Sequence, residues 1–518
     1  MRSLSISLQD QLLKGLRRFN RGLTDEKDLN ELALLKPKPY GLVPITELVD
    51  PTGSTVLWPH PQIFRLRKVT LLAFSTSIYE VDESTWNSTL LTTYDAFAPA
   101  STKAITAGGV WQAADFYDTW ILFNGSCVVW RANELAPFGE TEKVFVQDEV
   151  TIGTGASMRL GARAFYGGLS SDFWREDLED YLETQSSKLE DGTSLGLTMD
   201  STFVVWSSIG QDIFWPLHPR RMIYGEPHNE QYSIDRPYLR EMFMRNEAGF
   251  APVTFQGTVT VLKELGEFMI AYGNNGITAL QPVTVGGRPV FRQIHVADFG
   301  IWGRGAVSGD LKKHLFLDNG GLFWFLTADL QLKKLGYAEF GSVLPAAGLI
   351  VNYDQNEDEF YIASSSGNGY VLTENGLCRN NQRLTSIFRS AGALFGIASS
   401  VGQTQVELKT GRINFNISAH KTVHTVRVIH RNLSSVQVKV ESYQTPASAS
   451  AIDSGWINAN DDGVVHGQFG GTDFHISVRG TPGSDPTIES VDVEFQLDDV
   501  RYFRAQEPIA GESQRSLR

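Results

Sequence analysis

The segment Asp354-Gln-Asn356-Glu-Asp358 has the residue types and the spacing that come nearest to a metal site. D-x-N-x-D offers three oxygen ligands in the rhythm of a calcium-binding loop. Such a loop also needs a glycine at its sixth position and a carboxylate at its twelfth, where this chain has Glu359 and Ser365. We therefore interpret the segment as a polar turn between the apolar runs LIVNY and FYIAS.

Three histidines, His420, His424 and His430, lie close together in AHKTVHTVRVIHRN. On a strand His424 and His430 share a face, and His420 joins them if the strand extends that far. They would still be spread over many ångströms, which is too far to share one zinc ion. We interpret them as exposed histidines of a strand, and the sequence predicts no metal ligand among them.

Four carboxylates near aromatic residues are the candidates for glycoside hydrolysis, which needs two carboxyl groups facing one bond. They are Asp115, Asp118, Asp298 and Asp310. Nothing in the sequence brings any two of them together. The chain also has no G-x-S-x-G elbow, no P-loop and no G-x-G-x-x-G after a strand. The sequence therefore predicts a protein without catalytic residues, cofactor or bound metal, which is not an enzyme.

Composition narrows the partners that we expect. The 518 residues are 42% hydrophobic and carry a net charge of −14, so the chain as a whole would repel nucleic acid. The two cysteines, Cys127 and Cys378, are far apart, and we expect both to be reduced. The start MRSLSISLQDQLLKGL lacks the apolar core of a secretion signal, and no run reaches the ~18 apolar residues of a membrane span.

A recurring unit must position these residues: an apolar strand, a turn of Gly, Asn or Ser, and a second apolar strand. This is the pattern of a β-hairpin. Three successive turn centres, Asn274, Asn319 and Ser366, are 45 and 47 residues apart, and Ser75 and Asn124 are 49 apart, which is near the period of a propeller blade. Longer gaps of 84 and 66 residues would hold insertions. The sequence predicts a mainly β protein with a β-propeller-like domain of about six or seven blades, and a set of β-sandwich domains is the competing interpretation. The hairpins are LLAFSTSIYEV (71–81), TWILFNGSCVVW (119–130), FVVWSSIGQDIFWPL (203–217), FMIAYGNNGITAL (268–280), LFLDNGGLFWFL (315–326) and FYIASSSGNGYVL (360–372).

Four regions follow from these patterns. Residues 1–50 form an N-terminal arm with helical spacing at 7–19 and 25–35, followed by an extended proline-rich lead; a frayed terminus is the alternative. Residues 51–395 form the propeller, with insertions near 140–200 and 218–255. Residues 396–505, rich in alternating strands, form an antiparallel β-sandwich, and 506–518 form a tail.

The layout resembles virion structural proteins of tailed bacteriophages, in particular tail nozzle or hub components built around β-propellers. Three stretches carry the resemblance: FNRGLTDEKDLNELALLKPKPYGLVPI, the degenerate blade series that includes AADFYDTWILFNGSCVVWRA, and the end domain from VELKTGRINFNISAHKTVHTVRVI to VDVEFQLDDVRYF. The resemblance implies a ring of identical subunits, commonly six, around the channel through which the genome leaves the capsid. It has no catalytic residues to transfer.

The resemblance also implies partners and a location. The expected partners are copies of the chain, tail proteins on the adaptor or portal side, fibres, and DNA that passes without tight binding. The protein would be made in the host cytoplasm and reside in the virion tail. A glycan-binding or glycan-cleaving propeller, with Trp111 and Trp302 stacking on sugars, is the alternative. The arm and the long polar loop 218–243 are the expected contact regions, with Phe19, Leu29, Leu32, Tyr40, Arg220, Arg221, Tyr232, Arg236 and Tyr238 as the candidate residues.

Overall fold

The computed structural model is almost entirely β and separates into two compact units. We call them the propeller unit, Leu48–Gly367 with Gln382–Ser399, and the sandwich unit, Met1–Glu47 with Asn368–Asn381 and Ser400–Arg518. The structure describes residues 4–8, 29–45, 48, 50–95, 101–116, 119–131, 143–148, 153–160, 163–169, 202–206, 249–285, 288–345, 348–367, 369–380, 382–400, 405–415 and 417–498.

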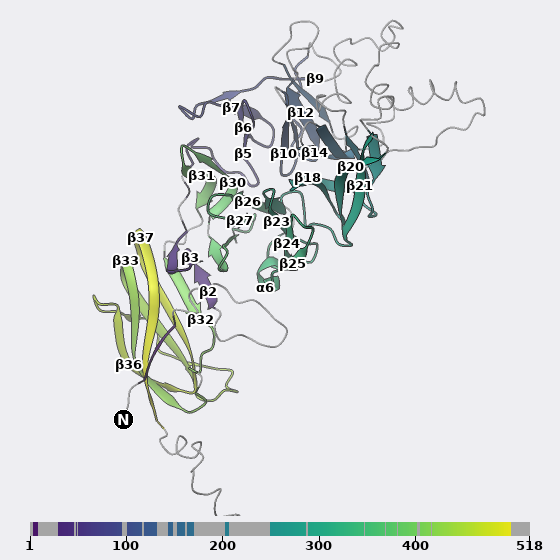
Figure 1. Ribbon diagram of the computed structural model, residues 1–518. Helices are drawn as coiled ribbons and strands as arrows, with labels where there is room; N and C mark the ends of the chain where they lie inside the picture. Colours follow the sequence, from purple (N-terminus) through teal and green to yellow (C-terminus); the bar gives the residue numbers. More distant parts are fainter. Residues whose placement is uncertain are drawn as a thin grey trace, which may run out of the picture. The chain divides into compact units, whose positions relative to one another are not determined.

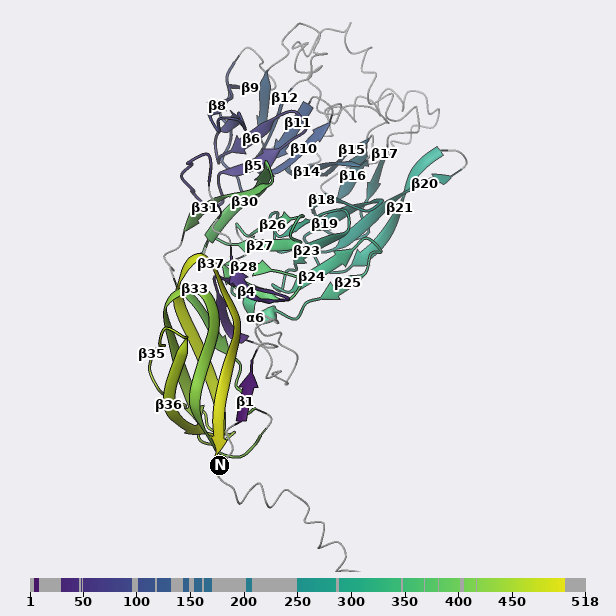
Figure 2. The same cartoon turned by 60° about the vertical axis from the view of Figure 1, so that its left-hand side comes forward.

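Seven sheets make up the described part of the propeller unit, and they fan out around a common centre (Figures 1 and 2). We number them as blades one to seven in chain order. The first four blades are β5–β8 (Gln62–Arg65, Thr70–Ala73, Ile78–Val81, Ser88–Leu90), β9–β13 (Thr93–Asp95, Gln112–Phe116, Thr119–Phe123, Cys127–Arg131, Val144–Asp148), β14–β17 (Gly153–Leu160, Arg163–Leu169, Phe203–Trp206, Gly249–Pro252) and β18–β21 (Val259–Leu265, Phe268–Gly273, Ile277–Val285, Arg288–Ala297).

The last two blades contain fewer strands within this unit. Blade five has four strands, and blades six and seven contribute two each; the short helix α6 (Ala338–Gly341) lies between blades five and six in the chain. The strands are β22–β25 (Val307–Gly309, Lys313–Leu317, Phe323–Thr327, Leu332–Lys334), β26–β27 (Ile350–Asp354, Glu359–Ala363) and β30–β31 (Gln382–Ser390, Ala393–Ser400). Seven blades confirm the predicted propeller.

The hairpin at 315–326 shows why the local sequence forms a blade. Strands β23 and β24 pair antiparallel from Lys313 with Thr327 to Leu317 with Phe323. The Asp318 carboxylate organises the turn, because it accepts hydrogen bonds from the backbone N–H groups of Gly320 and Leu322 and from Nε1 of Trp324. Antiparallel pairing likewise confirms the hairpins predicted at 71–81, 119–130 and 268–280.

Apolar side chains fill the spaces between neighbouring blades. Separate buried clusters join blades one and two, three and four, and four and five. A further cluster joins blade one to blade seven, where Ile63 and Leu72 pack with Phe388 and Ile397. The backbone N–H of Ile63 also donates to Oγ of Ser386 over 2.9 Å. The first and last blades therefore contact each other and close the ring.

The sandwich unit draws its strands from three distant parts of the chain. Its core is built on two long strands, β33 (Lys421–Tyr443) and β37 (Asp473–Leu497), which lie side by side in Figure 2. The other strands are β1 (Leu4–Ser7), β2 (Leu29–Ala33), β3 (Leu35–Lys38), β4 (Gly41–Pro44), β28 (Gly369–Leu372), β29 (Leu377–Asn380), β32 (Val406–Thr410), β34 (Ile452–Asp453), β35 (Ile457–Asn458) and β36 (Val464–Gly471).

The two long strands each serve both layers of the sandwich. Residues 421–431 of β33 pair with 487–497 of β37, and residues 433–443 pair with 473–482, with the register jumping in between. Asn432 and Ser435 at this jump have positive φ angles of 52° and 51°, a conformation that suits a sharp bend. One half pairs with β36 and β1, and the other with β32, β34 and β35. The predicted sandwich is confirmed.

The N-terminal region differs from the expected arm. Instead of a helix over 25–35, the described residues 29–33 form β2, which pairs with β32 inside the sandwich unit. A bulge between Leu29 and Glu31 inserts one extra residue. Because of that insertion, Leu29 and Leu32 are both buried although they are three residues apart, which is the spacing of a helix. Residues 9–19, the body of the other predicted helix, lie outside the described residues.

Candidate functional site

The propeller unit has an open cavity of about 290 Å³ where its blades meet. Six of the seven blades line it, through residues of β5, β18, β26 and β30 and residues in or beside β10 and β22. The inner strand of each blade faces the centre of a propeller, so side chains from several blades meet here. The central cavity is the candidate site that the tertiary structure creates.

Polar side chains of the cavity wall tie the blades together. Oε1 of Gln62 accepts the backbone N–H of Trp111 over 2.7 Å, which joins blade one to the residue before β10 of blade two. Nε2 of Gln112 donates to the carbonyl of Thr260 over 3.0 Å and so joins blade two to blade four. Oγ of Ser386 accepts from Ile63, as described above. These hydrogen bonds hold neighbouring and non-adjacent blades of the ring together.

The cavity lining carries positive charge without an acidic counterpart. Lys263 of β18 and Arg304, just before β22, are the two charged residues among the described residues that line it. The Arg304 guanidinium donates through Nη1 to the carbonyl of Phe123 over 3.0 Å, which fixes it in place. The lining contains no Asp, Glu, His, Cys or Tyr among the residues that the structure describes. It therefore offers hydrogen-bond donors and positive charge for an anion.

Lys263 lies deep in the propeller beside a buried tyrosine–histidine pair. Burial lowers the pKa of Lys263. The Tyr272 hydroxyl donates to Nδ1 of His314 over 2.8 Å, and Nε2 of His314 donates to the carbonyl of Glu264 over 3.0 Å. Burial, helped by the nearby charge of Lys263, lowers the pKa of His314 to about 3. His314 is therefore neutral and links β18 and β19 to β23.

The predicted polar turn at Asp354–Asp358 is present between β26 and β27. Its two outer carboxylates form ion pairs. Arg389 donates to both oxygens of Asp354 at 2.7 and 2.5 Å, and Lys313 donates to Asp358 at 2.6 Å. Tyr353 also donates to Asp358 over 2.8 Å, and its pKa is raised by burial and by this carboxylate. The segment joins blades five, six and seven.

His420 lies just before β33, and His424 and His430 lie on it; all three are partly buried. His420 pairs with Asp498 at 2.7 Å. Burial lowers the pKa of His430, the third histidine. Among the described residues no group of three His, Cys, Asp or Glu side chains could hold a metal ion.

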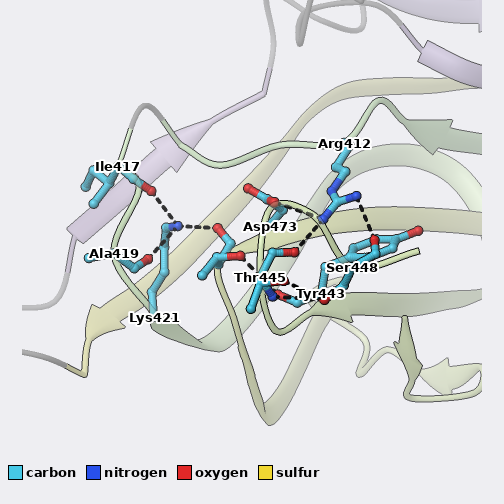
Figure 3. Close-up of polar contacts among 9 residues, drawn as sticks. Arg412, Ile417, Ala419, Lys421, Tyr443, Thr445, Ser448 and Asp473 are labelled. Atoms are coloured by element: carbon cyan, nitrogen blue, oxygen red, sulfur yellow. Dashed lines mark hydrogen bonds and ion pairs between the residues drawn. The ribbon is translucent and has the colours of Figure 1, made fainter. Parts of the chain in front are cut away.

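Figure 3 shows a buried lysine and a partly exposed arginine that fix the loops at the two ends of β33. The fully buried Lys421 donates to the carbonyls of Ile417 at 2.7 Å, Ala419 at 3.0 Å and Thr472. Three acceptors satisfy the three protons of the ammonium group. The Arg412 guanidinium stacks 3.9 Å from the ring centre of Tyr443 and pairs with Asp473 at 3.1 Å. Both cations form contacts that hold the sandwich unit together.

The four candidate hydrolytic carboxylates do not form a pair among the described residues. Asp115 accepts the backbone N–H of Arg67, Asp298 pairs with His295, and Asp310 accepts the backbone N–H groups of Lys312 and Lys313 in its own turn. Asp118 lies outside the described residues.

The two tryptophans proposed to stack on sugars are engaged within the propeller. Trp111 is buried, and its Nε1 donates to the carbonyl of Phe74. The half-buried Trp302 packs so closely on Gly321 that a Cβ there would lie 1.9 Å from its ring. Trp111 is therefore unavailable as a sugar platform.

The candidate contact residues differ in how far the structure leaves them exposed. Leu29 and Leu32 are buried inside the sandwich unit, so their side chains pack within their own chain in place of the expected contact with a neighbouring subunit. Tyr40 is 65% exposed and remains available. Phe19, Arg220, Arg221, Tyr232, Arg236 and Tyr238 lie outside the described residues.

Sequence reasoning missed Lys263 and Arg304. The one local sign of Lys263 was its position within the alternating strand VTVLKEL. It lies on the side of β18 that holds Val261 and Leu265.

Comparisons with known proteins identify no family for this chain. No protein-family model and no curated protein matches the chain. Among solved structures, the WD40 domain of Neurospora crassa Pan2 is 8% identical, with a TM-score of 0.32 over 68% of this chain and 86% of that one. BamB from Moraxella catarrhalis is 9% identical, with a TM-score of 0.30 over 65% and 91%. Apo AztD from Citrobacter koseri is 7% identical, with a TM-score of 0.30 over 82% and 90%.

Proposed function

We propose that this protein is a non-enzymatic structural component of a bacteriophage tail, of the nozzle or hub type. It assembles with copies of itself into a ring, with six as the expected number, around the channel for DNA ejection. Its further partners are neighbouring tail proteins, and its location is the virion. The proposal comes from the resemblance described above, and it is compatible with the two β units.

The observation that carries the proposal is the way the chain is threaded through its two units. The chain passes from one unit to the other four times, after residues 47, 367, 381 and 399. The propeller unit is therefore inserted between two parts of the sandwich unit. Residues 368–381, which separate the two parts of the propeller unit in the chain, also belong to the sandwich unit. Such threading suits a part that must stay intact under load, because a pull on one unit is shared by several crossings.

The chemistry of the described side chains supports the same interpretation. Several buried charges serve structural contacts: Asp354 pairs with Arg389, and Lys421 binds three backbone carbonyls. The net charge of −14 disfavours tight binding of passing DNA. In the described part of the chain, no helix is long and apolar enough to span a membrane.

The first test is the mass and shape of the purified full chain, by mass photometry with negative-stain imaging of the same sample. We expect particles that are a whole multiple of 57.4 kDa, six being the expected multiple, with an open centre. A charge reversal at Arg220 and Arg221 should reduce assembly, whereas Lys312→Glu on an exposed turn should leave it unchanged. A strict monomer at every concentration that also binds an array of host glycans would replace the proposal by the glycan-binding alternative.

A further inference from the structure

The central cavity of the propeller is positively charged inside an acidic protein. The chain carries −14, yet Lys263 and Arg304 are the charged residues among the described lining of the cavity. Non-specific attraction of anions to this protein is weak, because its overall field repels them. An anion that binds must therefore be held by a local arrangement of donors.

Lys263 lacks the partners that a buried ammonium group normally has. Its side chain forms no hydrogen bond and no ion pair with any described residue. Lys421 in the sandwich unit provides the contrast, since three carbonyls accept its protons. Buried charges in proteins are paired or hydrogen-bonded, because removing an ion from water is costly. The ammonium group of Lys263 can therefore donate hydrogen bonds to a ligand in the cavity.

Other donors line the same cavity. Nδ2 of Asn352 on β26 is buried and has no hydrogen-bond partner among the described residues. Oγ of Ser386 on β30 accepts the N–H of Ile63, which leaves the hydrogen of its own hydroxyl free to donate. Arg304 adds a second positive charge, held in place by its bond to Phe123. Three blades thus present donors of different kinds to one space.

We propose that the central cavity binds a small oxyanion of the size of inorganic phosphate, with Lys263 as the principal charged ligand and Asn352, Ser386 and Arg304 as additional donors. A cation would meet two positive charges and no carboxylate in the described lining. A neutral sugar would leave the ammonium group without a counter-charge. A phosphate-like anion has oxygens on all sides, and so it can accept bonds from several blades at once.

Ligand binding of this kind stabilises the closed ring. A ligand that contacts β18, β26 and β30 binds the folded propeller and not the unfolded chain, so it raises the free energy of unfolding by mass action. The cavity would then be a structural anion site, independent of whether the protein assembles in a tail.

The test is calorimetric titration of the full chain with potassium phosphate, alongside thermal unfolding in phosphate or in potassium chloride at matched ionic strength. We expect saturable binding of one phosphate per chain and a higher unfolding midpoint in phosphate. Lys263→Met should weaken phosphate binding by about tenfold or more, because it removes a charge-assisted hydrogen bond. It should also raise the midpoint without phosphate, because it removes an unpaired buried charge.

Lys312→Met is the matched control, since it removes the same charge from an exposed turn. It should bind phosphate as tightly as the parent chain. Asn352→Leu provides a second variant that keeps both cavity charges, and we expect a smaller loss of affinity from it. The proposal is overturned if the parent chain shows no saturable phosphate binding, or if Lys263→Met and Lys312→Met bind phosphate equally well.

Discussion

Phe474 and Phe495 lie on the same strand, β37, and both rings pack against one ring, that of Phe415, at 5.7 and 4.8 Å. The two residues are 21 positions apart, and a straight strand would separate them by about 70 Å. The strand therefore folds back on itself, and the bend lies where the β33 register jumps between Arg431 and Leu433. Phe415 thus joins the two layers that one pair of long strands creates.

Substitution of Phe415 by Ala should loosen both layers of the sandwich. Removing a large buried aromatic side chain costs about 3–5 kcal/mol in the free energy of unfolding, and Phe415 is 4% exposed. We expect faster amide hydrogen exchange in both halves of β37 and unchanged exchange in the propeller unit. Ile452→Ala, at a residue that is 60% exposed in the same unit, is the control. Faster exchange in one half alone would contradict the role of Phe415 as a shared contact.

Loss of Arg389 should destabilise the propeller by leaving a buried charge unpaired. The Asp354 side chain is 2% exposed and Arg389 is 25% exposed. Removing one member of such a pair costs about 3–5 kcal/mol, much of it for the stranded charge. Arg389→Met should therefore lower the urea midpoint of the propeller, and the addition of Asp354→Asn should recover part of the loss. Arg292→Met, at an exposed site, should change the midpoint little; a double variant no more stable than Arg389→Met would refute the argument.

His314 should make stability fall as the solution becomes acidic. Its pKa is lowered from 6.5 to about 3 in the folded protein, first by burial and then by Lys263, so the unfolded chain binds the proton more readily. Its contribution is complete above pH 6.5 and is lost as pH falls toward 3, at about 1.4 kcal/mol per pH unit. His314→Gln should remove this part of the slope. Parallel curves of unfolding free energy against pH for the two proteins would show that His314 does not cause it.

Removal of residues 1–47 should disrupt the sandwich unit and not merely its assembly. The deletion removes β1 to β4, including the buried Leu29, Leu32, Leu35 and Leu42. We expect aggregation, or a loss of hydrogen-exchange protection in β32, which pairs with β2, and in β37, which pairs with β1. Tyr40→Ala, at an exposed residue of the same segment, should keep the unit folded. A truncated chain with full protection in β32 would show that these strands are dispensable.

Much of the propeller could be predicted because its hairpins are local. Asp318 and its turn lie between the two strands that they connect, so Gly, Asn and Asp positions with flanking apolar runs contain the necessary information. The polar-turn interpretation of Asp354–Asp358 was possible for the same reason. Contacts between residues that are close in the chain produce local patterns that can be recognised in the sequence.

Only the tertiary structure decided the features that depend on distant residues. Ser386 meets Ile63 across 323 positions to close the ring, and Arg389 meets Asp354 across 35. The bulge at Leu29 gave a strand the spacing of buried residues that is typical of a helix, because an inserted residue changes which side chains share a face. Lys263 became a cavity residue only when six blades surrounded it. The sequence by itself determined the hairpins, since turn chemistry acts over a few residues. Ring closure, the cavity and the folded strand depend on packing between elements that are far apart in the chain, and no local sequence pattern shows which of these elements meet.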